Sequence, residues 1–257
     1  MRHFLRQVVR VFTTGSAFAS FFLGGAVLGW IVLPLVAATS PTPDEGARRC
    51  RRIVRRSWIL FHDLLRITRT IDFDPRKVNV ELPEGPCVFV ANHPTLLDAT
   101  AITAAMPDLT MVAKTAMYRT PVLGRLLRLC AFVEADEGSP FSGAEAAARC
   151  LARLQAGVPV LIFPEGTRSP ERGLGSFHAG AFQIAARAGV PVVPLLVRCE
   201  PPTLKRGDAW YDVPPETARM TIELLTRPCL PGPAPSDLAL RLHGVYLKAL
   251  GCEPTRS

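Results

Sequence analysis

The sequence predicts an α/β fold: a mixed, partly parallel central sheet flanked by helices, with an N-terminal membrane-associated helical segment. From about residue 76 onwards, short apolar runs alternate with longer segments of helical periodicity. Polar residues follow several of these runs directly, as expected where strands end in functional loops. Before this region, no charged residue occurs between Val11 and Pro43. We therefore expect three parts: an anchor (1–43), a basic amphipathic helix with a linker (44–75), and an α/β domain ending in a helix (76–257).

The anchor has an apolar core at about residues 17–38, which is long enough to cross a bilayer as a helix. Arginines stand on both sides of it, so a spanning helix would place one basic cluster against the positive-inside rule. A helix or broken hairpin that enters one leaflet avoids this conflict, and Gly24-Gly25 and Pro34 are possible break points. A cleaved signal peptide ending near Ala37 and Ala38 is the third alternative.

The second part contains a predicted amphipathic helix at residues 53–71, in which apolar residues are interleaved with arginines. Such a helix beside an anchor suits an anionic membrane surface. The alternative is an ordinary domain helix with a solvated charged face.

The composition bounds the partners and cofactors. The net charge is +8 in 257 residues, but aromatic residues make up only 7%, and no zinc-finger spacing or RNA-binding signature occurs. We therefore expect no nucleic-acid partner. The seven cysteines are odd in number and form no Cys-x-x-Cys, which favours reduced, buried thiols. No cluster with metal-ligand spacing occurs, so we expect neither a metal nor a bound cofactor.

The α/β domain has seven predicted strands, at residues 78–82, 87–91, 109–113, 131–134, 158–163, 190–197 and 221–225. Its predicted helices lie at residues 96–105, 121–129, 142–154, 179–188 and 237–250. A proline-rich stretch at 228–235 reads as a linker to the last helix.

The first chemical motif follows the strand at 87–91. His93 can act as a base near neutral pH, and Asp98 lies about one helical turn further on. A carboxylate bonded to one ring nitrogen fixes the tautomer and leaves the other nitrogen to take a proton. His93 and Asp98 are therefore the candidate catalytic pair.

The second motif follows the strand at 158–163. It offers a carboxylate, flexible backbone, a hydroxyl and a guanidinium at Glu165, Gly166, Thr167 and Arg168. Arg168 can bind a phosphate through two parallel hydrogen bonds. By itself the segment could equally be a surface turn with an exposed salt bridge. A nearby Gly173-x-Gly175 lacks the third glycine and the preceding strand of a nucleotide loop.

Together these motifs resemble the glycerolipid acyltransferase superfamily, which includes the 1-acyl-sn-glycerol-3-phosphate acyltransferases. The family's first block, Asn-His-x-x-x-x-Asp, matches Asn92, His93 and Asp98, and its third block, Phe-Pro-Glu-Gly-Thr-Arg-Ser, matches residues 163–169 in full. An apolar strand with two prolines, residues 190–194, resembles the fourth block. The resemblance covers about residues 76–225 and implies an α/β acyltransferase.

The second block matches in part. Lys114, Pro121 and Gly124 fit the family pattern, but Glu134 stands for aspartate and Ala135 for an arginine associated with binding the acceptor phosphate. Arg125 and Arg128 are candidates to compensate. His178 stands where the family often has lysine, and we interpret it as a positional substitute rather than a second base.

The resemblance implies transfer of an acyl chain from acyl-CoA or acyl carrier protein to a lysolipid hydroxyl, at a membrane and on its cytoplasmic face. The expected acceptor is lysophosphatidate, with another lysolipid, such as lyso-ornithine lipid, as the alternative. The implied substrate-binding residues are Asn92, Lys114, Glu165, Gly166, Thr167 and Arg168.

Two other classes of function compete with this prediction. A thioesterase would need a serine or cysteine nucleophile near His93, or an activated water, and the sequence has no Gly-x-Ser-x-Gly elbow. A non-catalytic membrane adaptor would leave the intact pair of motifs unexplained.

Overall fold

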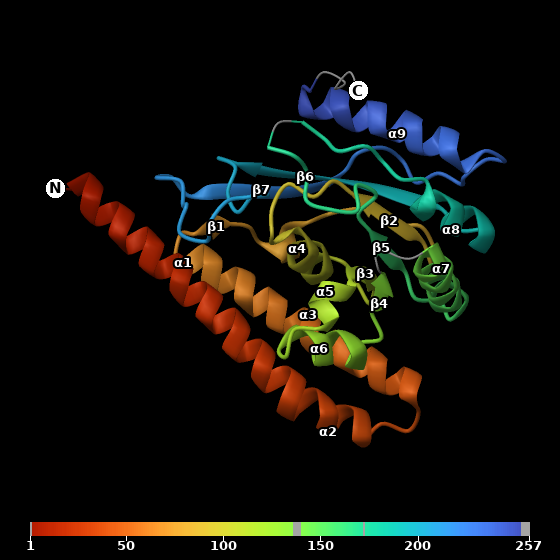
Figure 1. Ribbon diagram of the computed structural model, residues 1–257, viewed down its shortest axis with the longest axis horizontal. Coiled ribbons are helices and arrows are strands. Elements are labelled where there is room, and N and C mark those ends of the chain that lie inside the picture. The colour runs from red at the N-terminus through yellow and green to blue at the C-terminus, as the bar shows by residue number, and fades with distance from the viewer. Residues whose placement is uncertain (1, 136–139, 172, 253–257) are drawn as a thin grey trace.

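A seven-stranded sheet with helices on both faces forms the centre of the protein (Figure 1). The computed structural model describes residues 2–135, 140–171 and 173–252. The strand order is β1-β7-β6-β2-β5-β3-β4, and all neighbouring pairs are parallel except β6 and β7. The predicted fold class, a mixed and partly parallel sheet flanked by helices, is confirmed.

The elements have the following bounds. The strands are β1 Ile71–Asp72, β2 Val88–Ala91, β3 Thr110–Lys114, β4 Val133–Ala135, β5 Val160–Ile162, β6 Val192–Glu200 and β7 Ala218–Leu224. The helices are α1 Arg2–Val27, α2 Leu33–Ala38, α3 Pro43–Ile67, α4 Asp98–Ala105, α5 Thr115–Tyr118, α6 Leu123–Leu129, α7 Pro140–Gln155, α8 Gly180–Ala188 and α9 Pro235–Leu250. A π-helical turn, Leu28–Val32, joins α1 to α2.

Two apolar layers cover the sheet because successive strand residues point to opposite faces. In β2, Phe89 and Ala91 belong to a core with residues of α3 and α4. Val88 and Val90 belong to the opposite core, with residues of α7, α8 and α9. All four residues are buried, as expected of a central parallel strand that reads as a continuous apolar run.

Two predicted elements differ from the structure. The run at 78–82 is not a strand, and the first strand is the two-residue β1, which the sequence analysis placed at the end of the amphipathic helix. That helix is longer than predicted at its start: α3 begins at Pro43, where the Thr42 hydroxyl accepts a hydrogen bond from the Glu45 amide. The division into anchor, linker and domain stays a prediction; its residues 1, 136–139, 172 and 253–257 lie outside the described residues.

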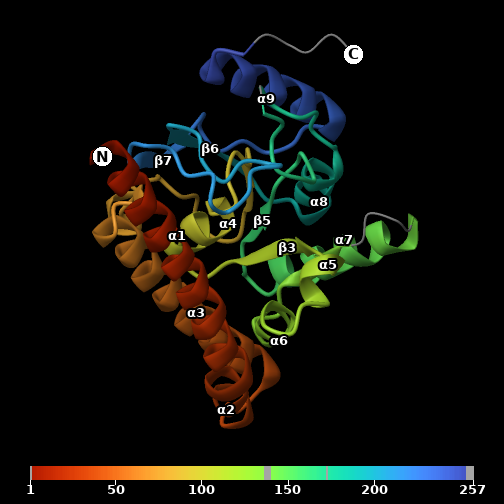
Figure 2. The same ribbon diagram turned by 60° about the vertical axis from the view of Figure 1, so that its left-hand side comes forward.

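The N-terminal helices form a hairpin, but not at the break points considered from the sequence. The helical path continues through Gly24-Gly25 and Pro34 to Ala38, and the chain reverses at residues 39–42 into α3. The π-helical turn just before Pro34 accommodates the missing backbone N–H of that proline. Figure 2 shows α1 lying along α3.

Buried polar contacts attach this hairpin to the sheet domain. Arg51, only 4% exposed, makes a two-pronged ion pair with Asp108 at 2.6 and 3.0 Å and donates to the Cys130 carbonyl. Near the start of α1, Arg10 donates to the carbonyls of Pro214 and Glu216. Both arms of the hairpin are therefore part of the same folded unit as the sheet.

His62 of α3 is fully buried beside the ring of Phe73, at 5.1 Å between centroids. Its Nε2 lies 3.1 Å from Oγ1 of Thr100, and that hydroxyl donates to the Leu97 carbonyl. Nε2–H therefore donates to Thr100, and Nδ1 has no hydrogen-bond partner within the described residues. Burial lowers the pKa of His62 from 6.5 to about 4.

This lowered pKa predicts an acid-sensitive stability. The unfolded chain protonates His62 below about pH 6.5, whereas the folded protein resists protonation until about pH 4. Stability is thus fully present above pH 6.5 and falls between these values, by about 3 kcal/mol. Denaturant unfolding at pH 7 and pH 4 measures this loss. In His62→Gln, which keeps an amide to reach Thr100 but does not titrate, the loss should be smaller by that amount. An equal loss in both proteins would contradict the assignment.

Candidate active site

The sequence motifs meet at one edge of the sheet. Strands β2, β5, β3 and β4 are neighbours and run parallel, so their carboxyl ends lie side by side. His93 follows β2, the loop 163–169 follows β5, and Lys114 and Ala135 end β3 and β4. This is the edge where open α/β sheets place their ligand sites.

His93 and Asp98 form a hydrogen-bonded pair. The Nδ1 of His93 lies 2.8 Å from Oδ2 of Asp98, which also accepts the Thr95 amide at 2.7 Å. Asp98 is fully buried, and burial raises its pKa while the bonds from His93 and Thr95 act in the opposite direction. Since Asp98 accepts a hydrogen bond from Nδ1–H, the proton of the neutral ring stays on Nδ1 and Nε2 is left as the basic nitrogen.

The carboxylate of Glu165 binds the backbone of His93 and so acts as a clamp on it. Its Oε1 accepts the His93 amide at 3.0 Å and the Ser169 hydroxyl at 2.7 Å, and its Oε2 accepts the Gly175 amide at 2.8 Å. The Ser169 amide in turn donates to the His93 carbonyl. Glu165 is 6% exposed, and burial raises its pKa against these bonds. The second motif, which carries Glu165, therefore holds the first motif, which carries His93, in place.

Two residues predicted to bind substrate lie behind the site rather than in it. Glu165 has the role just described and does not line the cavity. Asn92, 2% exposed, exchanges two 2.8 Å hydrogen bonds with the backbone N–H and C=O of Val197. It thus extends the pairing of β2 with β6 beyond the end of the strand and positions the following His93.

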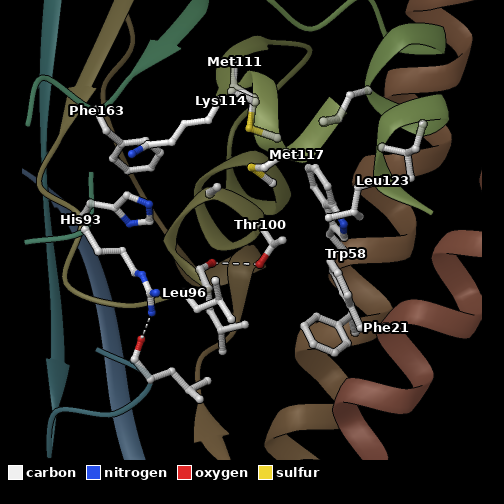
Figure 3. Close-up of a pocket in the computed structure, with 18 of the residues that line it drawn as sticks. Phe21, Trp58, His93, Leu96, Thr100, Met111, Lys114, Met117, Leu123 and Phe163 are labelled. Atoms are coloured by element: carbon white, nitrogen blue, oxygen red, sulfur yellow. Dashed lines mark hydrogen bonds between the residues drawn. The ribbon is translucent and has the colours of Figure 1, made fainter. Parts of the chain in front are cut away.

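A largely apolar cavity of about 520 Å³ opens beside His93 (Figure 3). Phe163 stacks on the imidazole at 4.1 Å between centroids and forms part of the wall. The opposite wall comes from the N-terminal hairpin, where Phe21 of α1 and Trp58 of α3 face the cavity. The volume is within the range of small-molecule sites, and the lining suits a hydrocarbon chain.

Four of the residues predicted to bind substrate line the polar end of the cavity: Lys114, Gly166, Thr167 and Arg168. Arg168 is also tied down, because its Nη1 donates to the carbonyls of Leu204 and Lys205. Ala135 lines the cavity in register with Lys114 on the neighbouring strand.

The two candidates to replace the missing arginine are engaged elsewhere. Arg125 lies over the ring of Trp30 at 4.6 Å, and Arg128 donates to the Tyr118 carbonyl. Neither is among the described residues that line the cavity.

Glycines shape the loops around the site. A Cβ at Gly124 would overlap the carbonyl oxygen of Tyr118, so the close approach of α5 and α6 requires glycine there. Gly166 has φ +69° and donates its amide to the Phe163 carbonyl. A Cβ at Gly175 would come within 2.9 Å of Glu165 Oε2, and Gly173 has φ +91°, so both glycines of the Gly173-x-Gly175 pattern have a backbone reason. His178 is exposed beside Gly166 and is not among the described residues that line the cavity.

Several groups that build the site have no role in the sequence-based prediction. The hydroxyl of Ser169 and the amide of Thr95 complete the hydrogen bonding. Ser169 belongs to the matched third block, but only the folded structure reveals that it bonds to Glu165. The cavity wall from α1 had a signal: Phe18, Phe21 and Phe22 recur at helical spacing and could have been read as a packed stripe.

Comparisons with known proteins agree with this geometry. A family model described as acyltransferase matches residues 62–198, which is more than half of the chain. A solved structure, the 1-acyl-sn-glycerophosphate acyltransferase PlsC from Thermotoga maritima, superposes with a TM-score of 0.70 over 99% of this chain and 100% of that one, at 18% sequence identity. This likeness supports the fold.

Curated relatives include 1-acyl-sn-glycerol-3-phosphate acyltransferases. The chloroplastic protein from Brassica napus is 37% identical over 117 residues, covering 46% of this chain and 34% of that protein. The protein from Pseudomonas aeruginosa is 31% identical over 150 residues, covering 56% of each. The chain thus spans between about a third and just over half of the length of these relatives. Because the family model covers more than half of its residues, the chain belongs to the acyltransferase family.

Proposed function

We propose that the protein transfers a fatty acyl chain from a thioester donor, acyl-CoA or acyl carrier protein, to the free hydroxyl of 1-acyl-glycerol-3-phosphate. The observation that carries this proposal is the His93–Asp98 pair at the polar end of a cavity with an apolar interior. A base at the boundary between a polar rim and a hydrocarbon-sized slot suits a reaction that joins a polar hydroxyl to an acyl chain.

In the proposed mechanism, Nε2 of His93 takes the proton of the acceptor hydroxyl while that oxygen attacks the thioester carbonyl. Asp98 holds the ring and stabilises the imidazolium that forms. Collapse of the tetrahedral intermediate expels the donor thiolate, which receives the proton back from Nε2. The acceptor oxygen is itself the nucleophile, so no acyl-enzyme forms.

Charge that develops on the carbonyl oxygen requires donors at the polar rim. Gly166 cannot supply its amide, which already donates to Phe163. Thr167, Lys114 and Arg168 line the cavity and are the groups we assign to the oxyanion and to the acceptor headgroup.

A nucleophilic thioesterase fits the site less well. Among the described residues that line the cavity there is no serine or cysteine. Ser169 lies beside the backbone of His93, but its hydroxyl donates a hydrogen bond to Glu165 and not to the imidazole.

The acceptor has a second candidate, because a specific observation favours it. Ala135 stands beside Lys114 at the cavity and supplies no cation. A lysolipid without phosphate, such as lyso-ornithine lipid, would place less demand on positive charge there. Lysophosphatidate remains our first proposal, since the named relatives carry that activity.

We also propose that α1 and α2 lie in one membrane leaflet, with the active site facing the cytoplasm. In the described chain, one helix, Gln7–Ala38, is long and apolar enough to cross a membrane, and only 17% of its most apolar window is buried. Two distant points of this helix contact the sheet domain: Arg10 near its start bonds to Glu216, and the Trp30 indole, in the π-helical turn, donates to the Pro121 carbonyl. A spanning orientation would separate these contacts, whereas an in-plane orientation keeps them and both arginine clusters on one side.

Removing the base tests the catalytic assignment. His93→Ala should lower kcat about 10²–10⁴-fold with acyl-CoA and lysophosphatidate, since general-base catalysis supplies that factor. The matched control is His178→Ala, which removes an exposed imidazole outside the cavity and should leave the rate within about twofold. A kcat of His93→Ala equal to that of the unmodified protein would contradict the proposed mechanism.

Removing the clamp tests the positioning role of Glu165. Both oxygens of Glu165 accept hydrogen bonds, whereas glutamine replaces one of them with an NH₂ group. In Glu165→Gln this NH₂ faces another donor, so the variant should lose about 1–3 kcal/mol of folding stability. Because His93 then moves, kcat should fall by at least about tenfold while KM stays nearly constant. Glu171→Gln, at an exposed carboxylate paired with Lys205, is the control. A loss of stability with unchanged kcat would show that Glu165 is structural only.

Restoring the arginine tests the acceptor. Ala135→Arg should raise kcat/KM for 1-acyl-glycerol-3-phosphate over a phosphate-free lysolipid by roughly tenfold, through a charge-assisted hydrogen bond. Ala135→Met adds volume without charge and serves as the control. The first proposal fails if the unmodified protein acylates phosphate-free lysolipids alone in a radiolabelled acceptor panel.

A further inference from the structure

The segment after β6 exposes an aromatic pair that the proposed chemistry does not use. Trp210 is 48% exposed and Tyr211 is 55% exposed, and their rings meet edge to face at 5.6 Å. Large aromatic side chains with one polar atom are typical of membrane–water interfaces, where the ring meets lipid and the N–H or O–H meets water.

This segment contacts the loops of the active site at its beginning and α1 at its end. At its beginning, the Leu204 carbonyl accepts hydrogen bonds from Arg168 and from the Leu96 amide. At its end, the Pro214 carbonyl accepts from Arg10 of α1. Between these points the indole of Trp210 lies against α1, because a Cβ at Gly15 would be 3.1 Å from it. The pair is therefore held at a fixed place beside the helix.

The aromatic pair continues an exposed apolar face of α1. Phe12, one helical turn before Gly15, is 74% exposed, and Leu23 further along is 70% exposed. At the far end, Trp30 is 54% exposed and carries the Arg125 guanidinium over its ring. Gly15 and Trp30 are about 22 Å apart along the helix axis. Tryptophans thus flank an apolar, uncharged stretch at both ends.

Charge contributes little at the aromatic pair. The positive charges of Lys205 and Arg206 are balanced by the negative charges of Asp208 and Asp212. Both aspartates also accept hydrogen bonds from backbone amides of the segment, Asp208 from Lys205 and Asp212 from Ala209. Attachment there would depend on aromatic burial rather than on anionic headgroups, and should withstand salt.

We propose that Trp210 and Tyr211 form a second membrane contact, seated in the headgroup layer of a phospholipid bilayer. This contact holds α1 parallel to the membrane plane. It also keeps Leu96, a cavity-lining residue that is 45% exposed, beside the lipid from which an acceptor enters. The inference rests on the in-plane membrane association proposed above.

Depth-dependent fluorescence quenching tests the contact. Two single-tryptophan proteins are made in a Trp58→Phe background: Trp30→Phe retains Trp210, and Trp210→Phe retains Trp30. Each is mixed with phosphatidylethanolamine–phosphatidylglycerol vesicles whose lipids are brominated either near the carbonyl or near the chain end. Trp210 emission should shift to the blue and be quenched more by the shallow bromines, at low and at high salt.

The two reporters separate the two proposals. Quenching of Trp30 without quenching of Trp210 would overturn this inference and leave the membrane association intact. No response from either tryptophan would overturn both.

A functional measurement complements the spectroscopy. The double variant Trp210→Ser/Tyr211→Ser should acylate vesicle-borne lysolipid roughly tenfold more slowly than the unmodified protein, yet match it in detergent micelles, where no bilayer has to be reached. Leu240→Ser, at a 70% exposed leucine of α9 on the opposite side of the sheet, is the matched control and should behave as the unmodified protein does in both. Equal losses in vesicles and micelles would contradict a membrane role for the pair.

Discussion

The hydrogen bond between His93 Nδ1 and Asp98 Oδ2 is the interaction on which the rest of the site depends. It sets which ring nitrogen is basic, and it does so with a carboxylate that burial disfavours in its charged form. Two donors offset this cost at one oxygen of Asp98, the His93 ring and the Thr95 amide, and the Glu165 carboxylate holds the backbone amide of His93. Two buried carboxylates thus fix one imidazole at the mouth of the cavity.

The sheet order explains why residues some seventy positions apart act together. β5 inserts between β2 and β3, so its loop lies against the loop that carries His93, and Lys114 follows on the next strand. The N-terminal hairpin then supplies what the sheet edge lacks, an apolar wall from Phe21 and Trp58. A segment that looks from its sequence like a separate anchor is therefore also part of the proposed substrate cavity.

The alternation of apolar runs and helical segments was enough to predict the fold class. The spacing of the first motif was enough to predict that His93 and Asp98 form a pair. Local patterns could not reveal that Asn92 extends a strand pair with Val197, 105 residues away, because only tertiary pairing defines that contact. The same limit applies to the run at 78–82, whose apolar residues pack without joining the sheet. The hairpin turn at 39–42 was missed because glycine and proline were read as breakers, whereas the helix absorbs them.

A double-mutant cycle on kcat tests the central claim, that Asp98 acts on the reaction through His93. Asp98→Asn and His93→Ala are measured singly and together with the same donor and acceptor. If Asp98 works by orienting and charging the imidazole, the double variant should be no slower than His93→Ala alone, since nothing remains to be oriented. Losses that multiply in the double variant would contradict the account and assign Asp98 an independent role.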